Sequence, residues 1–312
     1  MVSSITGFLR RICHNEVKKS LTMDKLFDIS NLRCSYDKNY REGISKVVLE
    51  IHNLVVPRGK KIFIVGESGI GKSTILEVLG LMNNTIVHDN NTKFLFYDKS
   101  STEVDLLALW RKNSDKELSA FRLNHFNFIF QSTNLMRNFT AYENIALTRM
   151  IQGYSKKEAF AKTASVLADL GLGHIAEDRM AQELSGGQQQ RLAFARAILP
   201  DFTVLFGDEP TGNLDSDNAK RAMELLSAKL NQLDGSSAII VSHDMHLAAT
   251  FADMIIKIRK EGRKNGDVKD EVTYYGVIDQ TCVYTPSADK SSWSNGVDSY
   301  NSDEFETFLK RI

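Results

Sequence analysis

The 312-residue sequence predicts an α/β fold built on a mostly parallel sheet. Residues 61–65 read as a short buried strand that enters a glycine-rich loop and then a helix. Two further short apolar strands, at residues 204–208 and 238–242, lead directly into polar side chains. A helical apolar pattern follows the first of them, over residues 216–233. Alternation of buried strands with helices is typical of an open α/β sheet, whose functional side chains gather at the carboxyl ends of the strands.

The glycine-rich loop matches the phosphate-binding pattern G-x-x-x-x-G-K-[ST], the P-loop. Its glycines let the backbone bend until successive N–H groups point at phosphate oxygens. Lys72 adds a cation, and the Ser73 hydroxyl can ligate Mg²⁺. The alternative, a glycine-rich turn without a ligand, is disfavoured by the motifs that follow. The predicted phosphate-binding residues are Gly66, Glu67, Ser68, Gly69, Ile70, Gly71, Lys72, Ser73 and Thr74.

Composition excludes several classes of function. Lys plus Arg and Asp plus Glu both number 39, so there is no net basic field and direct nucleic-acid binding is not expected. No apolar run approaches the ~18 residues of a membrane span, so the chain is not expected to form a transmembrane pathway by itself. The three cysteines lack metal-ligand spacing, which fits a reducing compartment.

Two candidate ligand-binding side chains flank the P-loop in the sequence. Tyr36 follows the first predicted strand, at residues 26–29, and could stack on adenine; the alternative is an edge or core aromatic. Gln131 ends the apolar strand at 126–130 and could reach a metal or an attacking water; the alternative is a solvated turn residue.

A second anion site is predicted at Leu184-Ser185-Gly186-Gly187-Gln188, which runs into a helix over residues 189–199. Ser185 is placed to cap this helix, and two glycines leave its N–H groups bare at the positive end of the helix dipole. Two phosphate sites far apart in the sequence suggest either two ligands or one ligand held between two copies of the protein.

Asp208 and Glu209 end a buried strand beside the predicted P-loop site. Adjacent strand residues point to opposite faces, so the two carboxylates are expected to have different tasks. Asp208 would complete a Mg²⁺ shell through water, and Glu209 would act as base or position water. His243 ends the next strand and could touch the γ-phosphate, although a lone histidine there is more often structural.

These motifs, in this order and spacing, resemble those of the ATP-binding-cassette (ABC) ATPases over about residues 24–262. The strings at 183–191 and 208–215 are most similar to the lipoprotein-release, macrolide-export and cell-division branch. The resemblance implies a P-loop NTPase fold of the ABC ATPase type. Such a fold has a RecA-like core sheet, an antiparallel β subdomain and an inserted α-helical subdomain, here at about residues 132–190.

The resemblance also implies a function, an ATPase that binds ATP and Mg²⁺ in a head-to-tail homodimer or a pair with a second ABC ATPase. Such a pair would drive separate integral membrane permease subunits from the cytoplasmic face of a membrane, held there through that partner. The resemblance assigns a role to each motif residue. Within one chain, Tyr36 contacts adenine, Gly69, Gly71, Lys72 and Ser73 bind the phosphates and Mg²⁺, Gln131 and Asp208 bind Mg²⁺, Glu209 polarises the attacking water and His243 senses the γ-phosphate. Across the dimer, Ser185 and Gly187, within the signature Ser185 to Gln188, contact the γ-phosphate of the other copy, and Asp215 communicates between the two copies.

Two other functions compete with this interpretation. A soluble ABC ATPase of translation or DNA repair would usually have two cassettes or a long coiled coil, and this chain shows one set of motifs without sustained heptads. A small-molecule kinase would share the P-loop but not the signature or His243. The expected groove for a membrane partner surrounds residues 131–144, with Leu135, Met136 and Phe139 as apolar contacts.

The sequence is compatible with more than one role for each end of the chain. Residues 1–23 are either a disordered extension, with Met23 as the working start, or a short basic amphipathic helix that contacts a membrane surface or a partner. Residues 263–312 form a C-terminal extension of unknown role, in which 287–303 read as linker. A final helix at 304–312 has an apolar face that must bury against this domain or against a partner.

Overall fold

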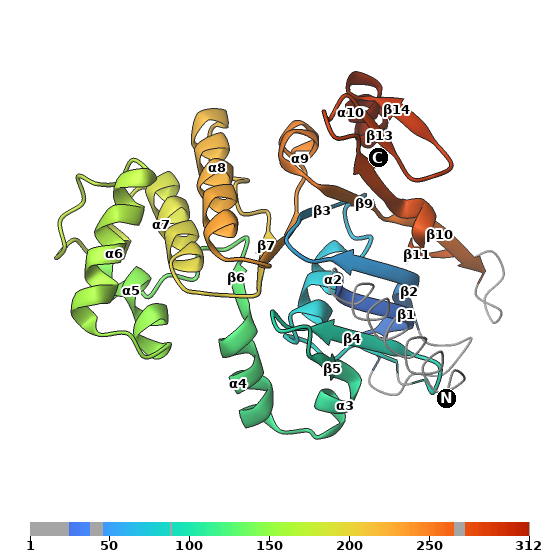
Figure 1. The fold of residues 1–312 in the computed structure, drawn as a ribbon, viewed down its shortest axis with the longest axis horizontal. Coiled ribbons are helices and arrows are strands. Elements are labelled where there is room, and N and C mark those ends of the chain that lie inside the picture. Colours follow the sequence, from blue (N-terminus) through green and yellow to red (C-terminus); the bar gives the residue numbers. More distant parts are fainter. Residues whose placement is uncertain (1–24, 38–45, 88, 265–271, 312) are drawn as a thin grey trace, which may run out of the picture.

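The computed structural model describes residues 25–37, 46–87, 89–264 and 272–311 (Figure 1). The expected N-terminal extension, residues 1–23, lies outside these ranges. Within them the chain forms two sheets and several groups of helices, which confirms the predicted α/β fold. No helix in the described part of the chain combines the length and apolarity that crossing a bilayer requires.

The larger sheet contains the parallel core. Strands β6, β7, β8, β3 and β9 pair in parallel in that order, so their carboxyl ends meet at one edge. Strands β3, β7 and β8 are almost continuously buried, as expected for a sheet covered on both faces. Three short antiparallel strands extend it beyond β9. The strands are β3 (Lys61–Val65), β6 (Phe126–Ile129), β7 (Val204–Asp208), β8 (Ser237–Val241), β9 (Met254–Lys257), β12 (Val283–Pro286), β13 (Ser292–Ser294) and β14 (Ser299–Asn301).

The second sheet is antiparallel except where β11 pairs in parallel with β2. The strand predicted at residues 26–29 is present as part of β1, and β1 and β2 each extend to 11 residues because they pair with one another along most of their length. In sheet order the strands are β10 (Arg259–Lys264), β11 (Val272–Ile278), β2 (Val47–Pro57), β1 (Lys25–Ser35), β4 (Lys93–Tyr97) and β5 (Glu103–Asp105).

Residues 103–125 divide into three elements. The first three residues form β5, and the rest form α3 (Leu106–Arg111) and α4 (Asp115–His125). Asn113 has a positive φ of 49° between the two helices, and Ser114 then caps α4 through the N–H of Glu117.

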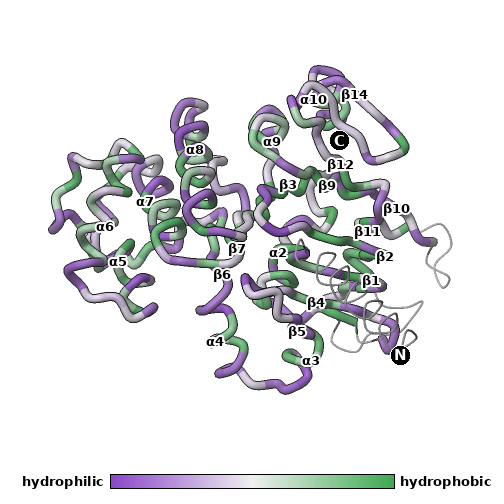
Figure 2. The backbone as a smooth tube through the Cα atoms, viewed as in Figure 1, coloured by the Kyte–Doolittle hydropathy of each residue, from purple (hydrophilic) through white to green (hydrophobic). Residues whose placement is uncertain are grey.

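Helices α5, α6 and α7 gather at one end of the molecule, with α8 beside them (Figure 1). In α6 the buried residues are Ala159, Thr163 and Leu167, because residues four apart share one helix face, whereas Ala161 is exposed. Figure 2 shows the apolar residues concentrated in the interior strands and the hydrophilic ones on outer helix faces such as that of α8. The helices are α2 (Lys72–Leu79), α5 (Ala141–Ile151), α6 (Lys156–Asp169), α7 (Gly186–Ile198), α8 (Ser216–Gln232), α9 (Met245–Phe251) and α10 (Ser302–Lys310).

The C-terminal segment is part of the packed domain. The boundary placed at residue 262 falls inside β10, and the strands that follow it join both sheets. The linker expected at 287–303 is wrong, because β13 and β14 form there around the buried Trp293. The apolar face of α10 buries within this chain, where the Phe305 ring stacks on Trp293 at 4.8 Å between centroids.

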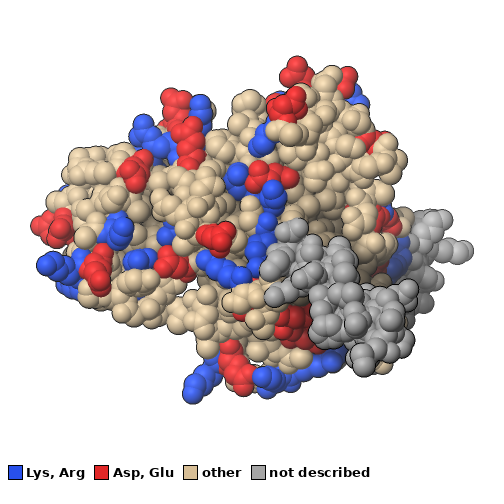
Figure 3. All heavy atoms as spheres, in the orientation of Figure 1, with Lys and Arg blue, Asp and Glu red and all other residues tan. Residues whose placement is uncertain are grey.

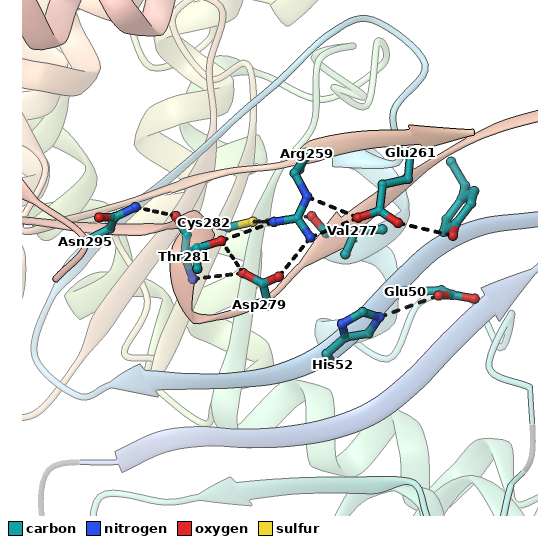
Figure 4. A network of polar contacts seen from close by, with 10 residues as sticks. Glu50, His52, Arg259, Glu261, Val277, Asp279, Thr281, Cys282 and Asn295 are labelled. Atoms are coloured by element: carbon teal, nitrogen blue, oxygen red, sulfur yellow. Dashed lines mark hydrogen bonds and ion pairs between the residues drawn. The ribbon is translucent and has the colours of Figure 1, made fainter. Parts of the chain in front are cut away.

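Arg259 fastens the β10–β11 pair to the turn that follows it (Figure 4). Its guanidinium donates to Glu261 Oε1 and Asp279 Oδ2, both at 2.9 Å. Burial disfavours the Asp279 carboxylate, but hydrogen bonds from Thr281 and Arg259 outweigh it and lower the pKa of Asp279 to about 2. The cluster therefore keeps its charges at any pH near neutrality.

Phe305→Ala is expected to lower the free energy of unfolding by about 3–5 kcal/mol, because it removes a fully buried ring that touches Trp293 and Tyr284. Urea denaturation followed by tryptophan fluorescence measures this change. The control is Val297→Ala, since Val297 is 78% exposed and should change stability by less than about 0.5 kcal/mol. Equal stabilities of the two variants would contradict the assigned packing of α10.

Candidate functional site: a P-loop cleft

The P-loop connects β3 to α2 at the carboxyl edge of the core sheet. Gly69 and Gly71 have φ values of +76° and +100°, a backbone region that only glycine adopts readily. The Lys72 side chain curls back over the loop, where its Nζ donates to Gly66 O at 2.8 Å and to Glu67 O at 2.7 Å. The loop is therefore shaped as a cradle with one cation at its centre.

Lys72 is a buried cation, only 6% exposed. Burial lowers its pKa from the ordinary value, and the nearby carboxylates of Glu209 and Asp208 counteract this effect. A phosphate group in the cradle would add negative charge beside the ammonium and favour its protonated form.

A cleft of about 560 Å³ opens over the P-loop. It brings together residues predicted separately along the sequence, from the first strand connection to the end of β8. The lining residues are Tyr36, Val48, Ser68, Gly69, Gly71, Lys72, Ser73, Thr74, Gln131, Asp208, Glu209, Val241 and His243.

Tyr36 stands at one side of the cleft. Its hydroxyl lies 3.0 Å from Thr74 Oγ1 on α2, and the residue is 55% exposed. The hydrogen bond fixes the ring beside the P-loop while leaving it available for stacking on an aromatic base.

The oxygen donors of the cleft fit a small hard cation. Ser73 Oγ donates to Asp208 Oδ2 at 3.0 Å, and Gln131 lines the same cleft. Mg²⁺ prefers such hydroxyl, carboxylate and amide oxygens and commonly shares its shell with substrate phosphates. Among the described residues, no group of three His, Cys, Asp or Glu side chains could hold a metal ion on its own.

Glu209 and His243 contact each other at the cleft. Glu209 Oε1 lies 3.0 Å from His243 Nε2. The strand alternation expected for Asp208 and Glu209 does not hold, because β7 ends at Asp208 and Glu209 has a left-handed φ of +49°. Both carboxylates consequently line the same cleft.

The signature residues lie outside this cleft. Ser185 caps α7 in a capping box, with its N–H donating to Gln188 Oε1 at 2.9 Å. Side-chain atoms added at Gly186 or Gly187 would meet nothing within 4 Å, so this helix start faces open space. Asp215 caps α8, and hydrogen bonds from Asn218 lower its pKa.

Three contributors to the P-loop surroundings were not predicted from the sequence. Val48 of β2 lines the cleft, and its carbonyl would lie 3.3 Å from a Cβ at Gly71. Lys260 of β10 pairs with the Glu67 carboxylate, 193 residues away in the sequence. A Cβ at Gly276 of β11 would collide with Ile70 O. A glycine inside a predicted strand is a sequence signal for such a close approach.

Comparisons with known proteins agree with this geometry. Residues 49–212 match the family model described as ABC transporter. The lipoprotein-releasing system ATP-binding protein LolD of Colwellia psychrerythraea is 38% identical over 216 residues, which cover 69% of this chain and 78% of that protein. The macrolide export ATP-binding/permease protein MacB of Campylobacter fetus is 36% identical over 231 residues, but this chain spans only 33% of its length.

A solved structure shares the fold. The dimeric structure of MJ0796, a bacterial ABC transporter cassette, superimposes with a TM-score of 0.60 at 30% identity, covering 74% of this chain and 94% of the other. The resemblance inferred from the motifs is thus confirmed, including its lipoprotein-release and macrolide-export branch. The chain therefore belongs to the ABC transporter family and is one of its ATP-binding, ATP-hydrolysing cassettes.

Proposed function

We propose that this chain works as a head-to-tail pair, with a second copy or another ABC ATPase, and transmits the energy of ATP hydrolysis to separate membrane-embedded subunits. The observation that carries the proposal is the separation of two anion-binding features. The cradle around Lys72 lies in the cleft, whereas the α7 start at Ser185 and Gly186 faces open space outside it. A second molecule placed head to tail would bring its α7 start over this cleft and complete the site. The solved structure of MJ0796, a relative of this chain, is a dimer, which supports a paired arrangement.

Each residue of the cleft then has a task. The P-loop amides and Lys72 hold the phosphates, while Tyr36 stacks on adenine. Ser73, Gln131 and, through water, Asp208 would hold Mg²⁺, which neutralises phosphate charge when bound. Glu209 accepts a proton from the attacking water, and His243, 3.0 Å from it, contacts the γ-phosphate.

The membrane partner would dock beside the loop at residues 132–139. Asn144 braces this loop from inside, donating to Met136 O at 3.0 Å and Phe139 O at 3.3 Å. Met136 and Phe139 remain 36% and 37% exposed, next to a cavity of about 530 Å³. A helix of a permease subunit could bury these side chains. The chain would then sit at the cytoplasmic face of a membrane, held there by its partner.

Ser185→Arg tests the paired site. It is expected to spare ATP binding but lower ATP hydrolysis by at least about 100-fold, since the bulky cation would obstruct only the phosphate contact supplied in trans. Equilibrium nucleotide binding and steady-state phosphate release measure the two effects.

The matched control is Ser155→Arg. Ser155 caps α6 with the same capping-box geometry, so both variants lose an equivalent helix cap worth about 1 kcal/mol. Full hydrolysis by Ser185→Arg at high protein concentration would contradict the paired model. Loss of activity in both variants would instead attribute the effect to the lost helix cap.

A further inference from the structure

Gln190 is a buried amide on α7 that reaches the Glu209 turn. The residue is 1% exposed, and its Nε2 donates to Pro210 O at 3.1 Å. Its Oε1 is buried and has no hydrogen-bond partner. The buried Oε1 has lost its hydrogen bonds to water, and only the single hydrogen bond of Nε2 offsets this cost. Packing of the interior therefore does not by itself explain why a glutamine occupies this position.

The turn that Gln190 reaches has an unfavourable backbone. Glu209 adopts a φ of +49°, which a side chain with a Cβ rarely adopts and which surrounding contacts must hold in place. The Glu209 N–H donates to Val241 O at 3.0 Å, which fastens the turn to β8. Gln190 holds the next residue of the turn, Pro210, by donating to its carbonyl oxygen. The turn is thereby held between the core sheet and helix α7.

We infer that Gln190 is a positioning residue for hydrolysis. Through Pro210 it holds the left-handed turn that directs Glu209 into the cleft, and it joins that turn to the helix whose start carries Ser185. This inference rests on the proposed role of Glu209 as the base. Because Ser185 lies little more than one helical turn from Gln190, a shift of α7 caused by a ligand at its start would reach Glu209 through this hydrogen bond.

Gln190→Met is the test, because methionine nearly matches glutamine in length and volume but cannot donate to Pro210. The kcat for ATP hydrolysis is expected to fall at least tenfold, with KM and the Kd for ATP changed by less than about twofold. Loss of kcat alone indicates a misplaced base, since the P-loop contacts that bind ATP remain.

Asn127→Leu is the matched control. Asn127 Nδ2 donates to Ala197 O at 2.6 Å, so it fastens the opposite end of the same helix to β6, away from Glu209. It should lower the Tm as much as Gln190→Met does while keeping kcat within twofold of wild type. Equal loss of kcat in both variants would assign Gln190 a structural role and overturn the inference.

A double mutant distinguishes a failure of this inference from a failure of the proposed role of Glu209 as the base. If Gln190 acts through Glu209, then Gln190→Met lowers the single-turnover rate of wild type at least tenfold but that of Glu209→Gln by less than twofold. Further slowing in the Glu209→Gln background would overturn the inference. Unchanged hydrolysis in Glu209→Gln alone would instead contradict the role of Glu209. Should Gln190→Met fail to fold, Gln190→Leu serves as the second variant, with the same expected loss of kcat.

Discussion

Replacing Glu209 with glutamine is expected to lower ATP turnover by about 10²- to 10⁴-fold while leaving ATP binding intact. The amide occupies the space of the carboxylate and can keep the 3.0 Å contact with His243. It cannot accept a proton from water, which is the task assigned to Glu209. Phosphate release at saturating ATP and equilibrium binding of a fluorescent ATP analogue measure the two quantities.

The same variant should accumulate an ATP-dependent dimer, because ATP that closes the pair is no longer consumed. Size-exclusion chromatography with and without ATP detects it. Glu224→Gln is the control, since Glu224 lies on the exposed face of α8 in a surface pair with Lys220 and should leave turnover unchanged. Turnover by Glu209→Gln within tenfold of wild type would show that another group activates the water.

Lys72→Ala is expected to weaken ATP binding itself, by about 10- to 100-fold, since hydrogen bonds to charged groups contribute about 1.5–3 kcal/mol each. The substitution removes the only Lys or Arg side chain among the described residues that line the cleft. It also frees Gly66 O and Glu67 O, which lose the donor that curls the loop around the ammonium. Isothermal titration calorimetry with ATP and Mg²⁺ measures the change in Kd.

Lys61→Ala is the control for a lost lysine in the same strand–loop–helix unit. Lys61 lies at the opposite end of β3, where its ammonium pairs with Asp253 at 3.0 Å. This variant should bind ATP as wild type does, although it loses an ion pair. A Kd for Lys72→Ala within threefold of that for Lys61→Ala would contradict the central place of Lys72 in the cradle.

The chain has 39 basic and 39 acidic side chains, so its net charge gives no reason to expect a steering effect on these measurements. Acidic and basic side chains are interspersed over the face shown in Figure 3, without a large region of one sign. Encounter with ATP should therefore depend on the cleft itself rather than on a long-range field.

The sequence predicted the P-loop site well because local chemistry specifies it. Glycines at 69 and 71, the cation at 72 and the hydroxyl at 73 are adjacent in the chain, and the structure places all of them in one cleft with Gln131 and His243. Each of the latter follows a short apolar strand, and parallel strands bring their carboxyl ends to one edge.

Non-local packing explains what the sequence did not predict. Gly276 and Lys260 approach the P-loop through β-pairing between segments far apart in the chain, which no short-range pattern records. The Ser-rich and Asn-rich stretch at 287–303 resembles a linker in composition, yet it surrounds Trp293 and receives Phe305 from α10. The left-handed φ of Glu209 depends on Val241 and Gln190, so strand alternation could not predict the direction of its side chain.

The order in which the chain is made gives the contact at Gly276 a further consequence. A ribosome releases the P-loop and strands β1 to β3 before it makes β11, which pairs with β2, passes Ile70 O and follows β10 in the chain. Until then the β2 edge lacks its parallel neighbour and remains open to pairing with other chains. The nucleotide-binding motif is therefore synthesised well before the strand that packs against it, and the exposed edge of β2 favours aggregation in this interval.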